Sequence, residues 1–257
     1  MPVSPTVTTA VILAAGTGSR LQPYTHNLPK CLVEVLGKPI LGHMLDTLEA
    51  VGFREVVIVT GFKAERVETY LKGRTSGMRI TTVHNARYAT TNNIYSLWLA
   101  EPHLKDGFAL IESDIVLDGS VMQQFLVENR IALERFDPSR HNGTTAEVCC
   151  DGYLCDLHIK KEPPSHKKLY KTVNIYSFCA QSKTNLLQRI HRRIEQQDTA
   201  VFYELAIKDL LDEQQIRLKM VDFSDHWWDE IDTPADLLRA EENGRPYLAL
   251  SSTLLCG

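Results

Sequence analysis

Small and basic residues stand close together near the N-terminus, in the stretch VILAAGTGSRLQPYTHNLPKCL over residues 11–32. Gly16 and Gly18 have no side chains, so their backbone N–H groups can approach an anion such as a phosphate. Arg20 offers a forked guanidinium that suits phosphate oxygens, and Lys30 offers a second positive charge on a chain stiffened by prolines. The stretch predicts a phosphate-binding site; the alternative is an ordinary strand, turn and helix start.

Two common phosphate-binding motifs do not fit this turn. A dinucleotide-binding fingerprint requires a third glycine where Leu21 stands, and a Walker A loop ends in Gly-Lys followed by Ser or Thr. Ala14 and Ala15 leave space beside the end of the apolar run for a flat base or a ribose. The turn therefore points to a nucleotide site of another kind.

Apolar segments that alternate between two patterns must position these residues. Short runs rich in Val, Ile and Thr predict strands, and runs with apolar residues three or four apart predict helices. The expected strands are residues 10–16, 55–61, 79–85, 107–114, 145–150 and 170–178. The expected helices are residues 40–52, 64–73, 92–104, 120–129, 185–197, 201–213 and 234–244. This alternation predicts a largely parallel sheet covered by helices, with ligands outside the carboxyl ends of its strands.

The order of elements changes in the second half of the chain. Around Asp151 and Gly152 the pattern predicts a hairpin, and thus an antiparallel extension of the sheet within residues 143–178. We expect a single domain over residues 1–257, with a core at about 10–240. The short apolar tail, residues 246–257, suits a last strand, a helix or a contact with a partner.

Composition narrows the class of protein. The net charge of -4 provides no global basic field that would hold nucleic acid or an anionic membrane. No apolar run approaches the roughly 20 residues of a membrane-spanning helix, and the N-terminus does not resemble a signal peptide, so we predict a cytoplasmic protein. Six cysteines with no CxxC pair are expected to be reduced thiols, mostly packed, with a metal site at positions 149, 150 and 155 disfavoured.

The pattern G-x-G-x-R-L-x-P-x-T followed by P-K-x-L, within residues 16–32, resembles the signature of nucleotidyltransferases that join NTPs to sugar 1-phosphates and small phospho-alcohols. The resemblance extends from Ala10 to about Arg239. It implies a Rossmann-like three-layer α/β/α fold with a mixed, mainly parallel sheet, whose glycine loop wraps the NTP phosphates. Lys30 and Arg20 would be catalytic. The implied nucleotide-binding residues are Leu13, Ala14, Ala15, Gly16, Thr17, Gly18, Ser19, Arg20, Lys30, Asn92 and Asn93.

The same resemblance implies two aspartates that hold a magnesium ion. They correspond to Asp114, at the end of an apolar strand, and Asp232, just before a helix. Magnesium prefers one or two carboxylates together with phosphate oxygens and water, which agrees with this pair. Each aspartate has the alternative role of a turn or capping residue. Asp229 competes with Asp232 as a ligand, and Thr233 with Pro234 would also suit a helix start.

Two further segments, YATTNNIYSLWLA and YKTVNIYSF, resemble the branch of the family that transfers CMP to phosphocholine or aminoethylphosphonate. Asn92 and Asn93 would cap the helix that follows, contact a pyrimidine or ribose, or do both. The implied acceptor-binding residues are Lys160, Lys171, Asn174, Tyr203, Glu204, Trp227, Trp228 and Asp229. At least half of the aromatic and acidic residues among them are expected to be structural instead, in core packing or on a solvated face. Aromatic residues alone do not separate a trimethylammonium cage from a primary-amine site.

The expected function is magnesium-dependent transfer of CMP from CTP to a small phosphonate or phosphate, with release of pyrophosphate. The acceptor is expected to be 2-aminoethylphosphonate ahead of phosphocholine. One alternative is a sugar-1-phosphate nucleotidyltransferase that makes an NDP-sugar, and a second is a non-catalytic nucleotide-binding regulatory protein. We expect no nucleic acid or membrane partner, and a monomer or homodimer.

Overall fold

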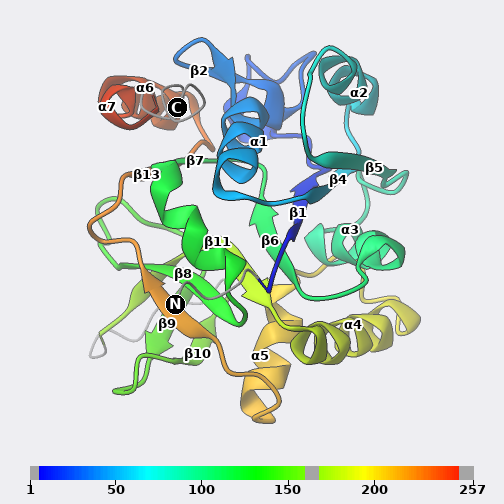
Figure 1. Cartoon of the computed structure of the whole chain (residues 1–257), viewed down its shortest axis with the longest axis vertical. Coiled ribbons are helices and arrows are strands. Elements are labelled where there is room, and N and C mark those ends of the chain that lie inside the picture. Colours follow the sequence, from blue (N-terminus) through cyan, green and yellow to red (C-terminus); the bar gives the residue numbers. More distant parts are fainter. Residues whose placement is uncertain (1–5, 160–167, 249–257) are drawn as a thin grey trace.

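The computed structural model describes residues 6–159 and 168–248, and its main element is a nine-stranded sheet (Figure 1). The strand order is β10-β9-β11-β6-β1-β4-β5, and β8 joins β11 to β12 beside this path. The strands are β1 (Thr9–Ala14), β4 (Glu55–Thr60), β5 (Arg79–His84), β6 (Phe108–Glu112), β8 (Arg130–Arg135), β9 (Thr145–Val148), β10 (Leu154–His158), β11 (Tyr170–Phe178) and β12 (Lys219–Asp222). Strands β6, β1, β4 and β5 are parallel, whereas β11 runs antiparallel to β6, β8 and β9.

Helices cover both faces of this sheet because its central strands are apolar on both sides. On β1, Ile12 belongs to one core cluster, and Val11 and Leu13 belong to the other. The first cluster packs under α1 (Ile40–Val51), α2 (Ala64–Lys72) and the 3-10 helix η4 (Gly119–Leu126). The second packs under α3 (Asn93–Ala100), α4 (Ala180–Glu195) and α5 (Glu204–Asp212). The predicted three-layer α/β fold with a mainly parallel sheet is confirmed.

Short elements complete the chain around the parallel core. The 3-10 turns η1 (Ser19–Leu21), η2 (Lys30–Leu32) and η3 (Glu101–His103) interrupt the loops. Two small antiparallel sheets pair β2 (Glu34–Val35) with β3 (Lys38–Pro39), and β7 (Ile115–Leu117) with β13 (Trp228–Glu230). Helices α6 (Pro234–Asn243) and α7 (Arg245–Leu248) follow β13. Residues 249–257 of the expected tail lie outside the described residues.

Sequence patterns identified most of the long elements and missed the short strands and the six-residue strand β8. All six predicted strands form, and the hairpin around Asp151 and Gly152 pairs β9 with β10 in antiparallel register. Strands β7, β8, β12 and β13 were not predicted, and the helix expected over 120–129 is the 3-10 helix η4. The prediction that all cysteines are reduced is wrong for Cys149 and Cys155, which form a disulfide across the hairpin.

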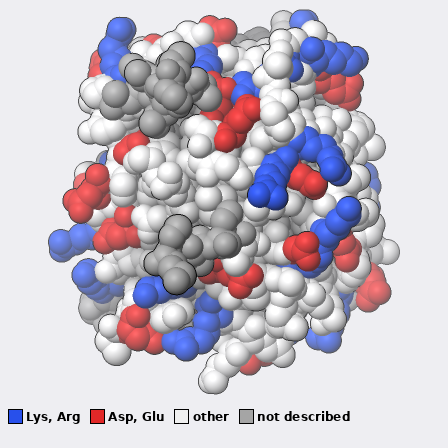
Figure 2. Space-filling view, viewed as in Figure 1, with Lys and Arg blue, Asp and Glu red and all other residues white. Residues whose placement is uncertain are grey.

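The surface agrees with the modest net charge. Figure 2 shows basic and acidic side chains interspersed over the face in view, without an extended area of one sign. Among the helices of residues 6–159 and 168–248, none is both long enough and apolar enough to cross a membrane.

Candidate active site

A cavity of about 360 Å³ opens at the carboxyl ends of β1 and β6, where the sequence placed the phosphate site. Residues 13–20 form one wall, and the N-terminus of α3 forms another. Predicted site residues outside that wall that line the cavity are Lys30, Asn92, Asn93, Asp114, Asn174, Glu204 and Asp232. Most of the predicted site therefore gathers around one hollow, although its segments are far apart in the sequence.

The glycine loop is held in a conformation that a side chain would disturb. Gly18 has a φ of +62°, in the left-handed region that favours glycine. A Cβ atom at this position would lie 3.0 Å from Cβ of Lys30 and 3.1 Å from Cγ2 of Thr25. The hydroxyl of Thr25 donates a hydrogen bond of 2.8 Å to the carbonyl of Gly18. The loop thus packs directly against the segment that presents Lys30.

Lys30 lies between the two predicted aspartates. Its Nζ donates to Oδ2 of Asp114 at 2.7 Å and also to Oδ1 of Asp232. Arg20 pairs with the other oxygen of Asp232 at 2.8 Å, while its own side chain stays 67% exposed. Burial alone would lower the pKa of Lys30, but the two carboxylates outweigh it and raise that pKa above its ordinary value. Lys30 therefore stays charged.

The small sheet of β7 and β13 brings Asp114 and Asp232 together. Glu230 pairs with Ile115 in antiparallel register, and the backbone N–H of Ile231 donates to the carbonyl of Asp114 at 2.9 Å. Thr233 takes the N-cap position of α6 and shares a capping box with Asp236. Asp232 thus lies one residue before the cap, so its carboxylate is left to face the cavity.

Three carboxylates at this point suit a divalent cation. Oxygen atoms of Asp114, Glu230 and Asp232 lie within 4.8 Å of one another. Oδ1 of Asp114 is buried and has no hydrogen-bond partner among the described residues. The competing ligand Asp229 is directed elsewhere, because its oxygens accept from Nε and Nη2 of Arg239 at 2.9 and 2.5 Å. The donor set of hard oxygens fits magnesium.

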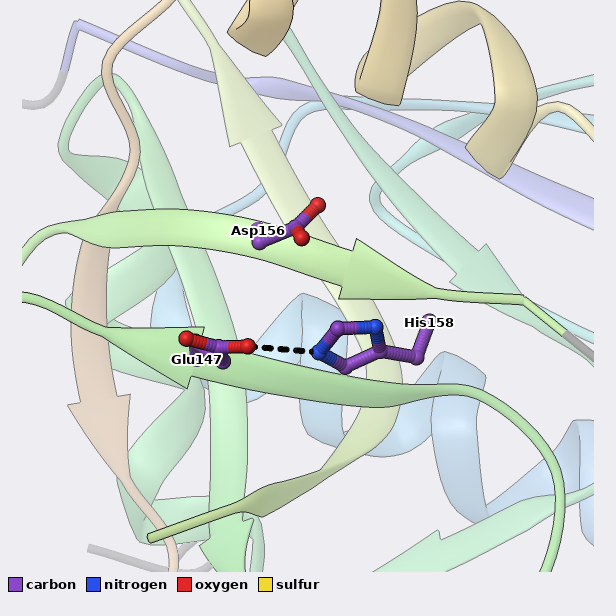
Figure 3. A group of neighbouring side chains, drawn as sticks. All are labelled: Glu147, Asp156 and His158. Atoms are coloured by element: carbon purple, nitrogen blue, oxygen red, sulfur yellow. Dashed lines mark hydrogen bonds and ion pairs between the residues drawn. The ribbon is translucent and has the colours of Figure 1, made fainter. Parts of the chain in front are cut away.

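A second group of residues with metal-binding side chains lies on the β9–β10 hairpin and consists of Glu147, Asp156 and His158 (Figure 3). Nε2 of His158 lies 2.8 Å from Oε1 of Glu147, as the dashed line marks. Asp156 accepts from Nζ of Lys208 at 2.5 Å. None of these three residues lines the cavity beside the glycine loop, so we assign no ion to this group.

Several predicted acceptor residues lie away from the cavity. Tyr203 is fully buried and packs edge-on against Tyr176. Trp227 stacks on Tyr247, and the indole N–H of Trp228 donates to Glu134 at 2.7 Å. The remaining predicted residues behave differently: Lys171 is buried and pairs with Glu230 at 3.2 Å, and Lys160 lies outside the described residues.

Both asparagines at the start of α3, Asn92 and Asn93, form hydrogen bonds with other groups of the protein. The side chain of Asn92 accepts from the backbone N–H of Asn93 as the N-cap. Asn93 donates through Nδ2 to Oε1 of Glu112 at 3.0 Å, and its Oδ1 accepts from the backbone N–H of Tyr203 at 3.0 Å. Asn93 therefore joins the ends of α3, β6 and α5, and fixes the floor of the cavity.

The sequence did not single out Glu112, Asn85 or Phe202, which also line the cavity. Burial first, and then the nearby carboxylates of Asp114 and Glu204, raise the pKa of Glu112 well above its usual range. Glu112 is the last residue of β6, and Asp114 follows two residues later. The position of Glu112 two residues before Asp114, at the same end of an apolar strand, was the sequence signal that could have identified it. Asn85 likewise follows β5 directly, at the edge where ligands of parallel sheets bind.

Comparison with known proteins places this site in a family. Residues 10–137 match the MobA-like NTP transferase domain. The chain is 34% identical over 243 residues to the CMP-5'-(3-aminopropyl)phosphonate synthase of Streptomyces rubellomurinus, a match that covers 90% of this chain and 38% of that protein. It is 40% identical over 101 residues to the choline-phosphate cytidylyltransferase of Streptococcus pneumoniae, covering 39% of this chain and 42% of that protein.

The matches thus span less than half the length of these two relatives. The structure resembles that of the CTP:phosphocholine cytidylyltransferase from Streptococcus pneumoniae with a TM-score of 0.79 and 25% identity, covering 92% of this chain and 99% of the other. The segment that matches the family model contains the glycine loop, Lys30 and Asp114, whereas Glu204 and Asp232 of the same cavity lie beyond it. By these similarities the chain belongs to the nucleotidyltransferase family.

Proposed function

We propose that this protein is a magnesium-dependent cytidylyltransferase that transfers CMP from CTP to a small amine-bearing phosphonate or phosphate and releases pyrophosphate. The observation that carries the proposal is the position of Lys30, beside the glycine loop and between Asp114 and Asp232. The similarity to a CMP-aminopropylphosphonate synthase and to a choline-phosphate cytidylyltransferase supports the choice of CTP and of the acceptor. We favour 2-aminoethylphosphonate, with phosphocholine next.

The reaction requires one bond to form and one to break at the α-phosphorus of CTP. An oxygen of the acceptor attacks this phosphorus in line, and the bond to the bridging oxygen breaks, so that pyrophosphate leaves with the electron pair. The backbone of the glycine loop would bind the phosphates, and Lys30 and Arg20 would offset the negative charge that develops on them. Asp114 and Asp232, with Glu230 beside them, would hold magnesium, which neutralises phosphate charge when bound.

The charge of the cavity favours an acceptor that carries a positive group. Its acidic lining residues are Glu112, Asp114, Glu204, Glu230 and Asp232, and its basic ones are Arg20 and Lys30. Lys30 and Arg20 pair with Asp114 and Asp232, and Lys171 pairs with Glu230. The pKa of Glu112 is raised well above its usual range, which leaves Glu204, whose Oε2 atom has no hydrogen-bond partner among the described residues. A neutral sugar offers no positive group to this acid, so the sugar-1-phosphate alternative is less well supported.

Pyrophosphate release tests the proposal directly. With magnesium, CTP, UTP, dTTP, ATP and GTP are each offered with 2-aminoethylphosphonate, phosphocholine and glucose 1-phosphate. We expect turnover with CTP and an amine-bearing acceptor. The variants Lys30→Met and Asp114→Asn should each lose at least about 100-fold in kcat, whereas Lys105→Met, at an exposed lysine, is the matched control.

Other outcomes of this experiment would change the proposal. Activity only with glucose 1-phosphate would identify the sugar-phosphate alternative, and silence in every pairing would favour the nucleotide-binding regulatory protein. Near-normal turnover in both Lys30→Met and Asp114→Asn would show that the assigned roles are wrong. A cytoplasmic location, the lack of nucleic acid or membrane partners, a single domain and a monomer or homodimer stay predictions.

A further inference from the structure

Glu204 occupies an unusual place in the cavity. It is the first residue of α5, only 5% of it is exposed, and yet it lines the hollow. Its Oε2 atom is buried and has no hydrogen-bond partner within the described part of the chain. A buried carboxylate oxygen without a partner is costly, because burial removes the water that would otherwise hydrate it. The site would therefore gain from a ligand that brings a donor to this oxygen.

The nearby basic side chains are engaged with other acids. Lys30 binds Asp114 and Asp232, and Lys171 pairs with Glu230 at 3.2 Å. Burial raises the pKa of Glu204 to about 7, which agrees with incomplete compensation of its charge by the protein.

The residues that line the cavity indicate which chemical group of a ligand would bind Oε2 of Glu204. A primary ammonium group carries three N–H donors, whereas a trimethylammonium group carries none and is recognised mainly by aromatic faces. The tryptophans expected to form such a cage lie elsewhere: Trp227 stacks on Tyr247, and Trp228 lies in the core. The aromatic residues that line the cavity in the described structure are Tyr88 and Phe202.

We propose that Glu204 binds the ammonium group of the acceptor and selects a primary amine over a trimethylammonium group. This inference rests on the proposed function and narrows its acceptor to an aminoalkylphosphonate or aminoalkyl phosphate. Asn93 is a positioning residue for this subsite, because its two hydrogen bonds hold Glu112 and the start of the Glu204 helix at the cavity floor.

Three acceptors that share one phosphonate group test this selection. They are 2-aminoethylphosphonate, its N,N,N-trimethyl derivative and ethylphosphonate, which has no amine. With CTP and magnesium, kcat/KM for the primary amine should exceed that for each of the other two by at least about 100-fold. In Glu204→Gln, the ratio of kcat/KM for 2-aminoethylphosphonate to that for ethylphosphonate should fall about 10- to 100-fold.

Controls separate recognition from folding and from the proposed function. Glu204→Asp keeps the charge and should retain more of the ratio than Glu204→Gln, and Glu242→Gln, at an exposed acid of α6, should retain all of it. Equal rates with the primary and trimethyl acceptors, or an unchanged ratio in Glu204→Gln, would overturn the inference while leaving the cytidylyltransferase in place. No pyrophosphate release from wild-type protein with any acceptor would overturn both.

Discussion

Replacing Glu204 by glutamine should increase the stability of the folded protein over that of wild type, and this increase should be larger at pH 8 than at pH 5. Burial raises the pKa of Glu204 to about 7 in the folded protein, above the ordinary glutamate value of 4.5. The folded state therefore binds this proton more tightly than the unfolded state does, so the side chain costs stability as the pH rises. The cost is absent well below pH 4.5 and complete above about pH 7.

The size of this cost follows from the two pKa values. Each tenfold difference in proton affinity corresponds to about 1.4 kcal/mol, so a pKa of about 7 against 4.5 corresponds to about 3 kcal/mol at pH 8. The amide of glutamine is also costly to bury without partners, which reduces the gain. We expect Glu204→Gln to raise the free energy of unfolding at pH 8 by roughly 1–2 kcal/mol, and by less at pH 5.

Urea unfolding at pH 5 and pH 8 measures this difference, with Glu242→Gln as the control for loss of one acidic charge at an exposed position. A gain of this size corresponds to a rise in melting temperature of about 2–8 °C for a chain of this length. A Glu204→Gln effect that is the same at both pH values would refute the reasoning, because it would mean that burial does not raise the pKa of Glu204. A larger effect at pH 5 would refute its sign.

Three further predictions concern the loop, the metal and the acidic network. Gly18→Ala should cost about 1 kcal/mol of stability in urea unfolding, because φ at this position is +62° and the new Cβ meets Lys30 and Thr25. The same variant should raise the KM for CTP in steady-state kinetics. Chelation of divalent cations should abolish pyrophosphate release, and added magnesium should restore it; full activity after chelation would contradict the metal role. Arg239→Ala should cost roughly 1–2 kcal/mol in urea unfolding, because it leaves the buried carboxylate of Asp229 without its charged partner. The partial exposure of Arg239 to solvent limits the size of this loss. No loss of stability would mean that solvent already screens the pair.

The parallel core was predictable because its signal is local and repeated. Strands such as β1 and β4 are apolar on both faces, and a helix with apolar residues on one face follows each of them. The glycine loop was predictable for a similar reason, since it comes directly after β1 at the edge where ligands bind. Three-residue strands leave no such signal. The pairing of β7 with β13 brings Asp114 beside Asp232, and it was reached through family resemblance, not through periodicity.

Around β13, residue type alone did not predict which side chains point toward the cavity. Successive strand residues point to opposite faces, so Trp228 enters the core and Asp229 turns to Arg239, while Glu230 reaches the cavity. A stretch rich in aromatic and acidic residues therefore looked like one acceptor pocket, although only part of it faces the ligand. The register of a short strand, which depends on contacts distant in sequence, decides which part that is.

The proposed reaction requires one cavity to accept two different substrates, and the distribution of charge in the cavity suits this requirement. Lys30 and Arg20 are held by Asp114 and Asp232 in the protein alone, so these four charges balance one another before any phosphate arrives. Oε2 of Glu204 has no hydrogen-bond partner among the described residues. Phosphates and a divalent cation can therefore exchange partners with a balanced set, whereas an ammonium group meets a carboxylate that burial has left uncompensated. Acceptor recognition should for this reason depend on one acid more strongly than nucleotide binding depends on any one of the four.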